Sequence, residues 1–245
     1  MKSAMEMLRS KSGLATAVLI AGGALAARVD AAVISKFTFE NYTAPTTATT
    51  SVSGITADEG TFAATATASS VHASAATFST PVGNGSTKSL SANTYATGDY
   101  FQFVTPTTGF SNIQLLVDQT SSATGPATFK VAYSADGTNF TDLPGGSYTL
   151  NSSVSFASGS EKSTSPPRYL FDFTGINALD NQPSITLRLI DTATTGATAG
   201  TSRIDNVTIG TDLPVPPPVP EPATCALLGL GGMALLLRRR RRAEA

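Results

Sequence analysis

Short runs in which hydrophobic and polar residues alternate recur along the middle of the chain, from residue 33 to about residue 212. In one of them, Ile185, Leu187 and Leu189 occupy alternate positions. Successive side chains of a β-strand point to opposite faces of a sheet, so this pattern predicts a strand with a buried face. No run in this part of the chain sustains the helical period of 3.6 residues. The pattern therefore predicts an all-β body.

The same alternation predicts further strands along the body. They cover residues 33–39, 62–69, 100–104, 113–117, 129–133, 148–156, 169–173, 185–190 and 203–209. Gly, Pro, Asn, Asp and Ser, the residues that turns favour, separate the runs. Because no helices are available for parallel crossovers, about ten such strands predict an antiparallel β-sandwich, which we place at residues 33–212.

Two stretches of the body depart from simple alternation. In the last predicted strand, Ile204 is out of phase with Val207 and Ile209. A β-bulge near Asp205 and Asn206 would restore the phase, and the alternative is that both faces are partly buried there. Residues 43–99 are rich in Thr, Ser, Ala and Gly. We expect strands with long loops in this stretch rather than a second domain.

A basic region, an apolar core and a series of small residues follow one another at the start of the chain. The core is residues 14–27, about the length of the apolar part of a secretory signal, and the basic residues before it are Lys2, Arg9 and Lys11. We predict a signal peptide over residues 1–32, cleaved after Ala31 or Ala32, with Ala26 or Ala27 as alternatives. A retained membrane anchor is disfavoured because the core is too short to span comfortably.

A proline-rich stretch, an uncharged stretch and a run of arginines follow one another at the other end. Residues 213–222 contain six prolines in ten, which favours an extended polyproline II linker. Residues 223–237 carry no charge, and as a helix they would extend about 22 Å, less than the ~30 Å hydrocarbon core. We predict a short transmembrane helix over 223–237 and a basic cytoplasmic tail over 238–245, with the body on the outer side.

This arrangement resembles the PEP-CTERM sorting signal. The resemblance rests on the motif Val219-Pro220-Glu221-Pro222-Ala223-Thr224, on the apolar stretch after it, and on the arginines that follow, Arg238, Arg239, Arg240, Arg241 and Arg242. It implies that an exosortase, a membrane cysteine transpeptidase, cleaves near the motif. The protein would be held briefly in the membrane and then passed to the cell surface or an exopolysaccharide matrix. A tail anchor that is never cleaved is the alternative.

A second resemblance concerns the body. Residues 129–140, with the sequence FKVAYSADGTNF, and residues 203–207, with the sequence RIDNV, are similar to motifs of secreted bacterial jelly-roll domains. Asp136-Gly137 can supply the positive φ that a tight hairpin needs. The resemblance implies a jelly-roll-like β-sandwich similar to carbohydrate-binding modules.

The charge distribution excludes some partners. Although the whole chain has a net charge of −1, residues 33–222 contain seven basic and fourteen acidic residues, a net charge of −7. An acidic body disfavours nucleic acid and anionic membrane surfaces as partners. One cysteine allows no disulfide within the chain.

Few residues could carry out catalysis. The one histidine is His72, and the one cysteine, Cys225, lies in the predicted transmembrane helix, where we expect a small apolar residue without chemistry. No zinc ligand cluster, G-x-S-x-G motif or phosphate-binding glycine loop occurs. His72 could act as a general base, but a strand or loop side chain is the expectation. No two acids are marked as a glycosidase pair, so we predict that the chain is not an enzyme.

Two binding sites remain as hypotheses. The jelly-roll resemblance implies a structural Ca²⁺ held by Glu40 and Asp205, with backbone carbonyl groups and Asn206 as further ligands. The alternative is a solvated Glu40 and an Asp205 that forms hydrogen bonds at the bulge. Sugar binding would use aromatic rings, and without Trp the candidates are Tyr42, Tyr95, Tyr100, Tyr133, Tyr148 and Tyr169, for which core packing is the default.

The sequence thus predicts an exported, non-catalytic β-sandwich protein with a structural or adhesive role at the cell surface or in the matrix. The first alternative is a carbohydrate-binding protein that holds exopolysaccharide, and the second is a hydrolase. No cofactor other than calcium is implied, and exosortase is the implied processing partner.

Overall fold

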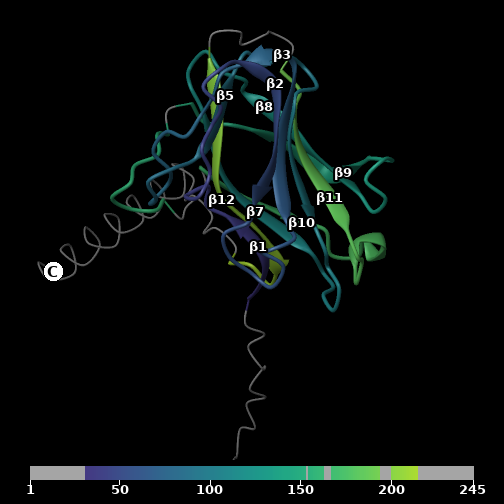
Figure 1. Cartoon of the computed structure of the whole chain (residues 1–245). Helices are drawn as coiled ribbons and strands as arrows, with labels where there is room; N and C mark the ends of the chain where they lie inside the picture. Colours follow the sequence, from purple (N-terminus) through teal and green to yellow (C-terminus); the bar gives the residue numbers. More distant parts are fainter. Residues whose placement is uncertain (1–30, 153, 163–166, 194–199, 215–245) are drawn as a thin grey trace, which may run out of the picture.

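Two antiparallel sheets packed face to face form the described part of the protein (Figure 1). The structure, a computed structural model, describes residues 31–152, 154–162, 167–193 and 200–214. Within these residues the one helix is a 3₁₀ turn, Asn177–Leu179. The predicted all-β, antiparallel sandwich is confirmed.

The first sheet has the strand order β10-β7-β12-β5-β4. Strand β5 pairs with the first part of β12, residues 201–204, and β1 pairs with its last part, residues 207–211. Its strands are β1 (Ala32–Phe37), β4 (Phe78–Ser79), β5 (Leu90–Asn93), β7 (Gln114–Ser121), β10 (Arg168–Asp172) and β12 (Thr201–Thr211). The second sheet has the order β2-β3-β6-β11-β8-β9. Its strands are β2 (Thr49–Thr56), β3 (Thr67–Ala76), β6 (Tyr100–Thr105), β8 (Thr128–Ser134), β9 (Thr141–Thr149) and β11 (Ile185–Asp191).

The core lies between the two sheets and is built from alternate residues of their strands. Phe101 and Phe103 of β6 are fully buried, as are Leu187 and Leu189 of the neighbouring strand β11. Phe37 of the first sheet packs against Phe103 of the second, with ring centroids 5.5 Å apart. Burial of such side chains is the main favourable contribution to folding. Every second residue of these strands is therefore hydrophobic because it packs between the two sheets.

The bulge predicted in the last strand is confirmed. The pairing of β12 with β7 shifts register between Asp205 and Thr208, and Asn206 has a φ of 47°. One extra residue allows Ile204 and Val207 both to face the core, where both are fully buried. The bulge also brings the side chains of Asp205 and Asn206 to buried positions.

The predicted hairpin at Asp136-Gly137 is present between β8 and β9. Gly137 has a φ of 73°, a conformation that favours glycine. The carboxylate of Asp136 accepts hydrogen bonds from the backbone N–H groups of Thr138 and Asn139, at 2.8 and 2.7 Å. These bonds also lower the pKa of Asp136, together with the side-chain bond from Asn139, which contributes most.

Two of the predicted strand ranges are wrong in part. Residues 61–65 form turns, in which the N–H of Ala66 donates to the carbonyl oxygen of Phe62, and β3 begins only at Thr67. The Ala and Thr residues around this turn alternate in the sequence as they would in a strand, but the small side chains within it do not form a continuous buried face. Residues 150–156 are not a strand either, because β9 ends at Thr149. Val154 and Phe156 alternate correctly but lie in a loop over the first sheet.

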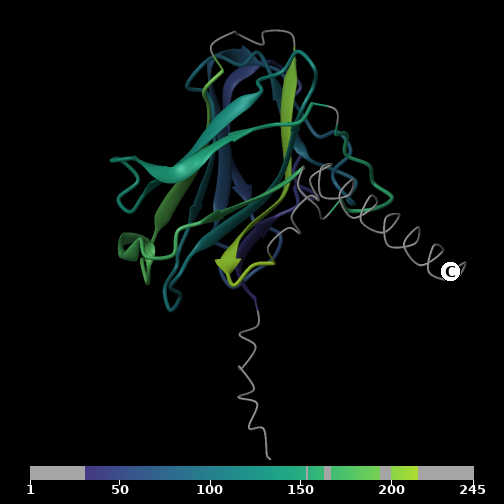
Figure 2. The ribbon, with the colours of Figure 1, turned by 180° about the vertical axis from the view of Figure 1, so that it is seen from behind.

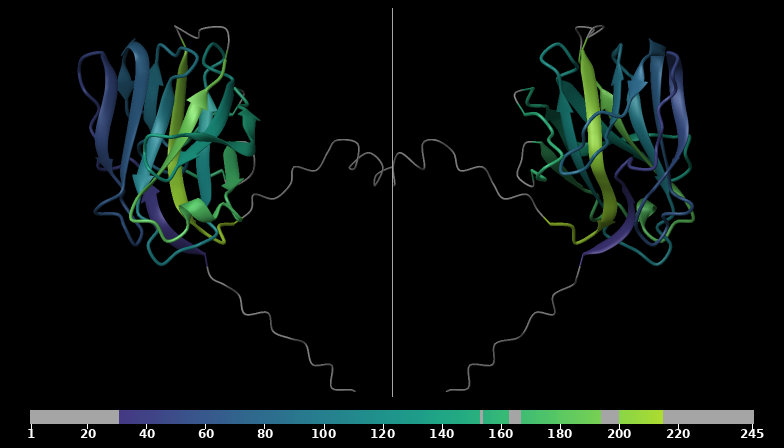
Figure 3. Two further views of the ribbon diagram at one scale, coloured as in Figure 1. Left: turned by 90° about the vertical axis from the view of Figure 1, so that its right-hand side faces the viewer. Right: turned by 60° about the vertical axis from the view of Figure 1, so that its left-hand side comes forward.

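Both ends of the described chain leave from the same end of the sandwich (Figures 1 and 3). Ala32 at the start of β1 pairs with Thr211 at the end of β12. In the view from behind, β12 runs through the middle of the first sheet toward this end (Figure 2). The chain that leads to the C-terminal linker therefore continues directly from a central strand.

Candidate functional site

Several predicted functional residues lie outside the described residues. They are the signal peptide up to residue 30, the motif residues from Val219 to Thr224, the uncharged stretch 223–237 with Cys225, and the arginines Arg238 to Arg242. Among the residues that are described, no helix is both long and apolar enough to cross a membrane. The signal peptide and the transmembrane helix stay predictions.

The two predicted calcium ligands lie on either side of one loop, residues 83–88. Glu40 accepts hydrogen bonds from the backbone N–H groups of Thr87 and Lys88, at 2.8 and 2.9 Å. Asp205 accepts bonds from the backbone N–H of Asn84, at 2.7 Å, and the hydroxyl of Ser86, at 2.6 Å. Loop 83–88 is therefore attached to the sandwich through both carboxylates.

This arrangement satisfies both carboxylates with protein hydrogens. N–H and O–H donors point at the oxygen atoms, so an ion on the same atoms would require the loop to move. Within the described ranges, no three His, Cys, Asp or Glu side chains gather closely enough to hold a metal. Calcium binding by Glu40 and Asp205 stays a prediction, which requires that a chelator lowers the melting temperature of the full chain. An unchanged melting temperature would contradict it.

Asp205 belongs to a larger buried cluster, which we call the Asp118 network, made of Asn84, Asp118, Arg168, Asp205 and Asn206. The guanidinium of Arg168 donates to both carboxylate oxygens of Asp118, at 2.7 and 2.9 Å, and Asp118 is fully buried. The amide groups of Asn84 and Asn206 donate to Asp118 Oδ2, at 2.7 and 3.0 Å. Burial raises the pKa of Asp205 to about 7, and hydrogen bonds from Ser86, Asn84 and Asn206 oppose this shift.

The Asp118 network joins segments that are far apart in the sequence. Asn84 also bonds the backbone of Lys162 twice, through its side-chain oxygen at 2.9 Å and its amide group at 3.0 Å. Its members come from loop 83–88, β7, β10 and β12. None of the network's side-chain atoms that are shielded from solvent lacks a hydrogen-bond partner, which is the condition for a buried polar cluster to be tolerated. This points to a structural part in fastening the loops to the first sheet.

His72, the candidate general base, lies in β3 and faces the core. Its ring nitrogen Nδ1 is 3.2 Å from Asp99 Oδ2, and Nε2 is 3.2 Å from the hydroxyl oxygen of Ser70. This order of groups is also that of a serine hydrolase. Ser70 is fully buried, however, and the rings of Tyr95 and Phe78 cover the imidazole at 4.6 and 5.3 Å. Burial lowers the pKa of His72, which Asp99 partly opposes, and the imidazole is enclosed with its hydrogen-bond partners inside the sandwich.

The candidate tyrosines mostly pack into the sandwich. Tyr95 is buried, and those partly buried against the core are Tyr42, Tyr133, Tyr148 and Tyr169. Tyr100 lies on the outer face of the second sheet, where the guanidinium of Arg188 is 4.1 Å from its ring and 3.6 Å from that of Phe140. Core packing, the default expectation, thus holds for all but Tyr100.

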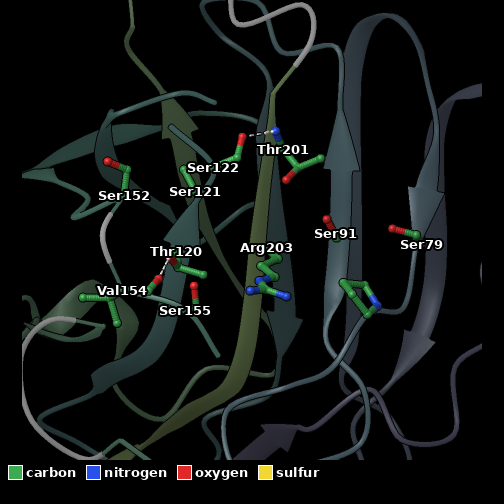
Figure 4. Close-up of a pocket in the computed structure, with 11 residues that line it drawn as sticks. Ser79, Ser91, Thr120, Ser121, Ser122, Ser152, Val154, Ser155, Thr201 and Arg203 are labelled. Carbon is green, nitrogen blue, oxygen red and sulfur yellow. Dashed lines mark hydrogen bonds between the residues drawn. The ribbon is translucent and has the colours of Figure 1, made fainter. Parts of the chain in front are cut away.

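A groove of about 380 Å³ opens on the outer face of the first sheet, in the size range of small-ligand sites (Figure 4). Four of its residues are register partners in neighbouring strands, in the order Ser79 of β4, Ser91 of β5, Arg203 of β12 and Thr120 of β7. Register partners share one face of a sheet. Because Ile204 faces the core, Arg203 and its partners face outward.

The other side of the groove is formed by the loop after β9, which the sequence wrongly assigned to a strand. The hydroxyl of Thr120 donates to the carbonyl oxygen of Val154, and Ser152 and Ser155 are exposed at the rim. Among the residues that the structure describes, eight Ser and Thr residues line the groove and no acidic residue does. They are Ser79, Ser91, Thr120, Ser121, Ser122, Ser152, Ser155 and Thr201.

Arg203 lies between these hydroxyl groups, with Thr120 and Ser155 to one side and Ser91 and Ser79 to the other (Figure 4). Its guanidinium is 5.1 Å from the ring of Phe156, and its polar contact is a long bond, 3.4 Å, to the carbonyl oxygen of Val82. Unlike Arg168, it forms no ion pair with any described carboxylate. Burial lowers the pKa of Arg203, which reflects a charge held partly away from water without a counter-ion.

Sequence reasoning did not find this groove. Its residues lie between positions 79 and 203, and only strand register brings them together. Ser and Thr are abundant throughout the chain, so their presence in the sequence carries no signal. The one available signal was Arg203 itself, since residues 33–222 contain only seven basic residues.

A family model, the PEP-CTERM protein-sorting motif, matches residues 218–242. The match confirms the resemblance inferred from the C-terminal residues. No curated protein sequence matches the chain.

Several solved structures are similar to this chain at low identity. The CBM22-1–GH10 modules of Clostridium thermocellum xylanase 10B, complexed with xylohexaose, are 14% identical, with a TM-score of 0.40 over 77% of this chain and 30% of that one. The K3 cleaved adhesin domain of Lys-gingipain from Porphyromonas gingivalis is 12% identical, with a TM-score of 0.35 over 74% and 99%. A carbohydrate-binding module of the β-sandwich superfamily is also 12% identical, with a TM-score of 0.32 over 74% and 63%.

This chain thus spans less than a third of the xylanase chain that it matches. At these values the likenesses carry no statement about ligand or activity. What the residues and the family match together establish is that this chain carries the PEP-CTERM protein-sorting motif at residues 218–242, directly behind an all-β sandwich body.

Proposed function

We propose that the protein is exported, processed at its sorting motif by an exosortase, and retained at the cell surface or in the exopolysaccharide matrix, where it has a structural or adhesive role without catalysis. The observation that carries this proposal is the position of the motif. The last strand ends at Thr211, and the family match begins at residue 218, so a short proline-rich linker separates the body from the sorting signal. Such a linker would keep the motif open to a processing enzyme at the membrane surface.

The arrangement of the polar groups supports a role without catalysis. Ser70, His72 and Asp99 are the described residues that most resemble a catalytic group, and the exposed fractions of the latter two residues are both 3%. A hydrolase needs its nucleophile open to substrate, which the full burial of Ser70 prevents.

Mass spectrometry of the mature C-terminus tests processing. In protein recovered from outside the producing cell, we expect the arginines of residues 238–242 to be absent and the terminal peptide to end near Pro222. Glu221→Gln alters the motif and should leave uncut protein, whereas Glu59→Gln, at an exposed position of the body, should be processed normally. Native protein recovered in the cytosol with all five arginines attached would contradict the proposal.

Carbohydrate binding is the second candidate function, and one observation favours it. Ser and Thr residues line the outward groove on the first sheet, and the hydroxyl groups of Ser79, Ser152 and Ser155 are exposed there. A hydroxyl can both donate and accept hydrogen bonds, which is the chemistry that recognises sugar hydroxyls. In this form of the proposal, the adhesive role consists of holding matrix polysaccharide.

A further inference from the structure

We propose that the groove around Arg203 binds a carboxylated polysaccharide, one whose sugar units carry uronate groups. The inference rests on the export proposed above, because only an exported protein would meet polysaccharide outside the cell. It goes further in naming the site, the charge of the ligand and the residue that selects it.

The first step of the argument is the unpaired charge. The structure describes three arginines in the body, and two of them have evident partners. Arg168 forms an ion pair with Asp118, and Arg188 donates to Gln102 at 2.8 Å while lying between two aromatic rings. Arg203 has a ring beneath it and one long hydrogen bond, so most of its N–H donors remain available.

The second step is the geometry that arginine offers. A guanidinium presents its donors in a planar fork that matches a carboxylate with two parallel hydrogen bonds. Phe156 is buried and its ring lies against the Arg203 guanidinium, which limits the orientations of the fork. Because the side chain is held in this way, less conformational entropy is lost when a ligand binds.

The third step is the surroundings of the charge. Thr120 and Ser91 are the register partners of Arg203 on its two sides, and Ser155 lies near it on the loop (Figure 4). Ser79, Ser152 and Ser155 are exposed, and no described protein group forms a hydrogen bond with their hydroxyls. A cation in a groove whose rim carries the exposed hydroxyl groups of Ser79, Ser152 and Ser155 suits a ligand that has one carboxylate among several hydroxyls, as a uronate unit does.

The charge of the rest of the body works against any polyanion. With a net charge of −7 over residues 33–222, long-range electrostatics should repel an acidic polymer. Binding must then come from local contacts, which in a groove without acidic residues fall to Arg203. The site therefore differs from a general basic patch, and removing a single guanidinium should abolish most of the affinity.

The test is binding of the purified full chain to immobilised polygalacturonate, a polymer of uronate units. Arg203→Gln should weaken binding by about tenfold or more, which corresponds to the loss of charge-assisted hydrogen bonds. Arg203→Lys keeps the charge without the planar fork and should retain part of the affinity. Every chain in the comparison has the arginines of residues 238–242 changed to glutamine, so that this tail contributes no binding of its own to the polyanion.

Two controls make the site and the ligand class falsifiable. Arg188→Gln removes an arginine from the outer face of the opposite sheet and should leave binding within about twofold. Carboxyl-reduced polygalacturonate should not bind the chain that keeps Arg203. Unchanged binding by a folded Arg203→Gln variant, an equal loss with Arg188→Gln, binding of the reduced polymer, or stronger binding of dextran sulfate would each overturn the proposal. Melting curves establish that the variants are folded, and none of these outcomes depends on whether the tail is processed.

Discussion

Arg168→Gln is expected to lower the free energy of unfolding by about 3–5 kcal/mol, because it leaves a buried carboxylate without its partner. Asp118 is fully buried and receives two hydrogen bonds from the guanidinium. Glutamine keeps much of the apolar stem of arginine but removes the positive charge and the fork. The amide donors of Asn84 and Asn206 would remain on Asp118 Oδ2 without neutralising the charge. Urea unfolding monitored by circular dichroism measures the change.

A second variant separates the unpaired charge from lost packing. In the double variant Arg168→Gln with Asp118→Asn, the amide oxygen of residue 118 can still accept from Asn84 and Asn206, and residues 118 and 168 carry no charge. We expect it to be more stable than Arg168→Gln alone. Lys130→Gln breaks the exposed ion pair with Asp142 and should change stability by less than about 1 kcal/mol. A small effect of Arg168→Gln, equal to that of Lys130→Gln, would show that the Asp118 network contributes little.

Phe103→Ala should lower the free energy of unfolding by about 3–5 kcal/mol, because it leaves a cavity between the sheets. Phe103 is fully buried and its ring packs against Phe37 of the opposite sheet. The neighbouring residue Val104 is partly exposed on the other face of β6. Val104→Ala should therefore lose no more than about 1 kcal/mol. Thermal and urea unfolding of the two variants compares the faces, and equal losses would contradict the assignment of inner and outer faces.

Much of the fold could be predicted because one face of each strand is buried. The run with Ile185, Leu187 and Leu189 is β11, and all three side chains face the core. The bulge at Asp205 and Asn206 could be predicted because a single strand cannot otherwise bury both Ile204 and Val207. Both features depend on side chains buried between the sheets, which require a hydrophobic residue at every second position of a strand.

The failures have equally local causes. Residues 61–65 consist mostly of small side chains, for which alternation carries little information, and backbone hydrogen bonds close a turn instead. Strand β9 contains Pro144 and Gly145, which disfavour a strand, but it is an edge strand, where such residues are tolerated. Phe156 continues the alternation of hydrophobic and polar residues past Thr149, where β9 ends, so the predicted strand was too long. Its ring packs against Arg203 on the opposite sheet.

The sites were harder to predict than the fold. The jelly-roll-like motif at residues 203–207 drew attention to Asp205 in the sequence. Nothing in the sequence indicated Asp118 or Arg168, which the register of β7, β10 and β12 brings next to Asp205. Arg203 was visible as one of few basic residues, but the groove around it was hidden, because its neighbours in space are ordinary Ser and Thr residues from other strands. Tertiary pairing decides such clusters, and the local pattern of residues along the chain does not reveal which strands pair.

The position of Arg203 on β12 has a mechanical consequence. The same strand continues into the linker through which the sorting signal is attached, and it is held by β7 on one side and by β5 and β1 on the other. If a polymer pulls on Arg203 while the C-terminal end is tethered, the tension follows one strand. Because both points of force application lie on β12, the covalent backbone between Arg203 and Thr211 would carry the load. The hydrogen bonds to β7, β5 and β1 would then be loaded little, and the other strands would lie outside the force path.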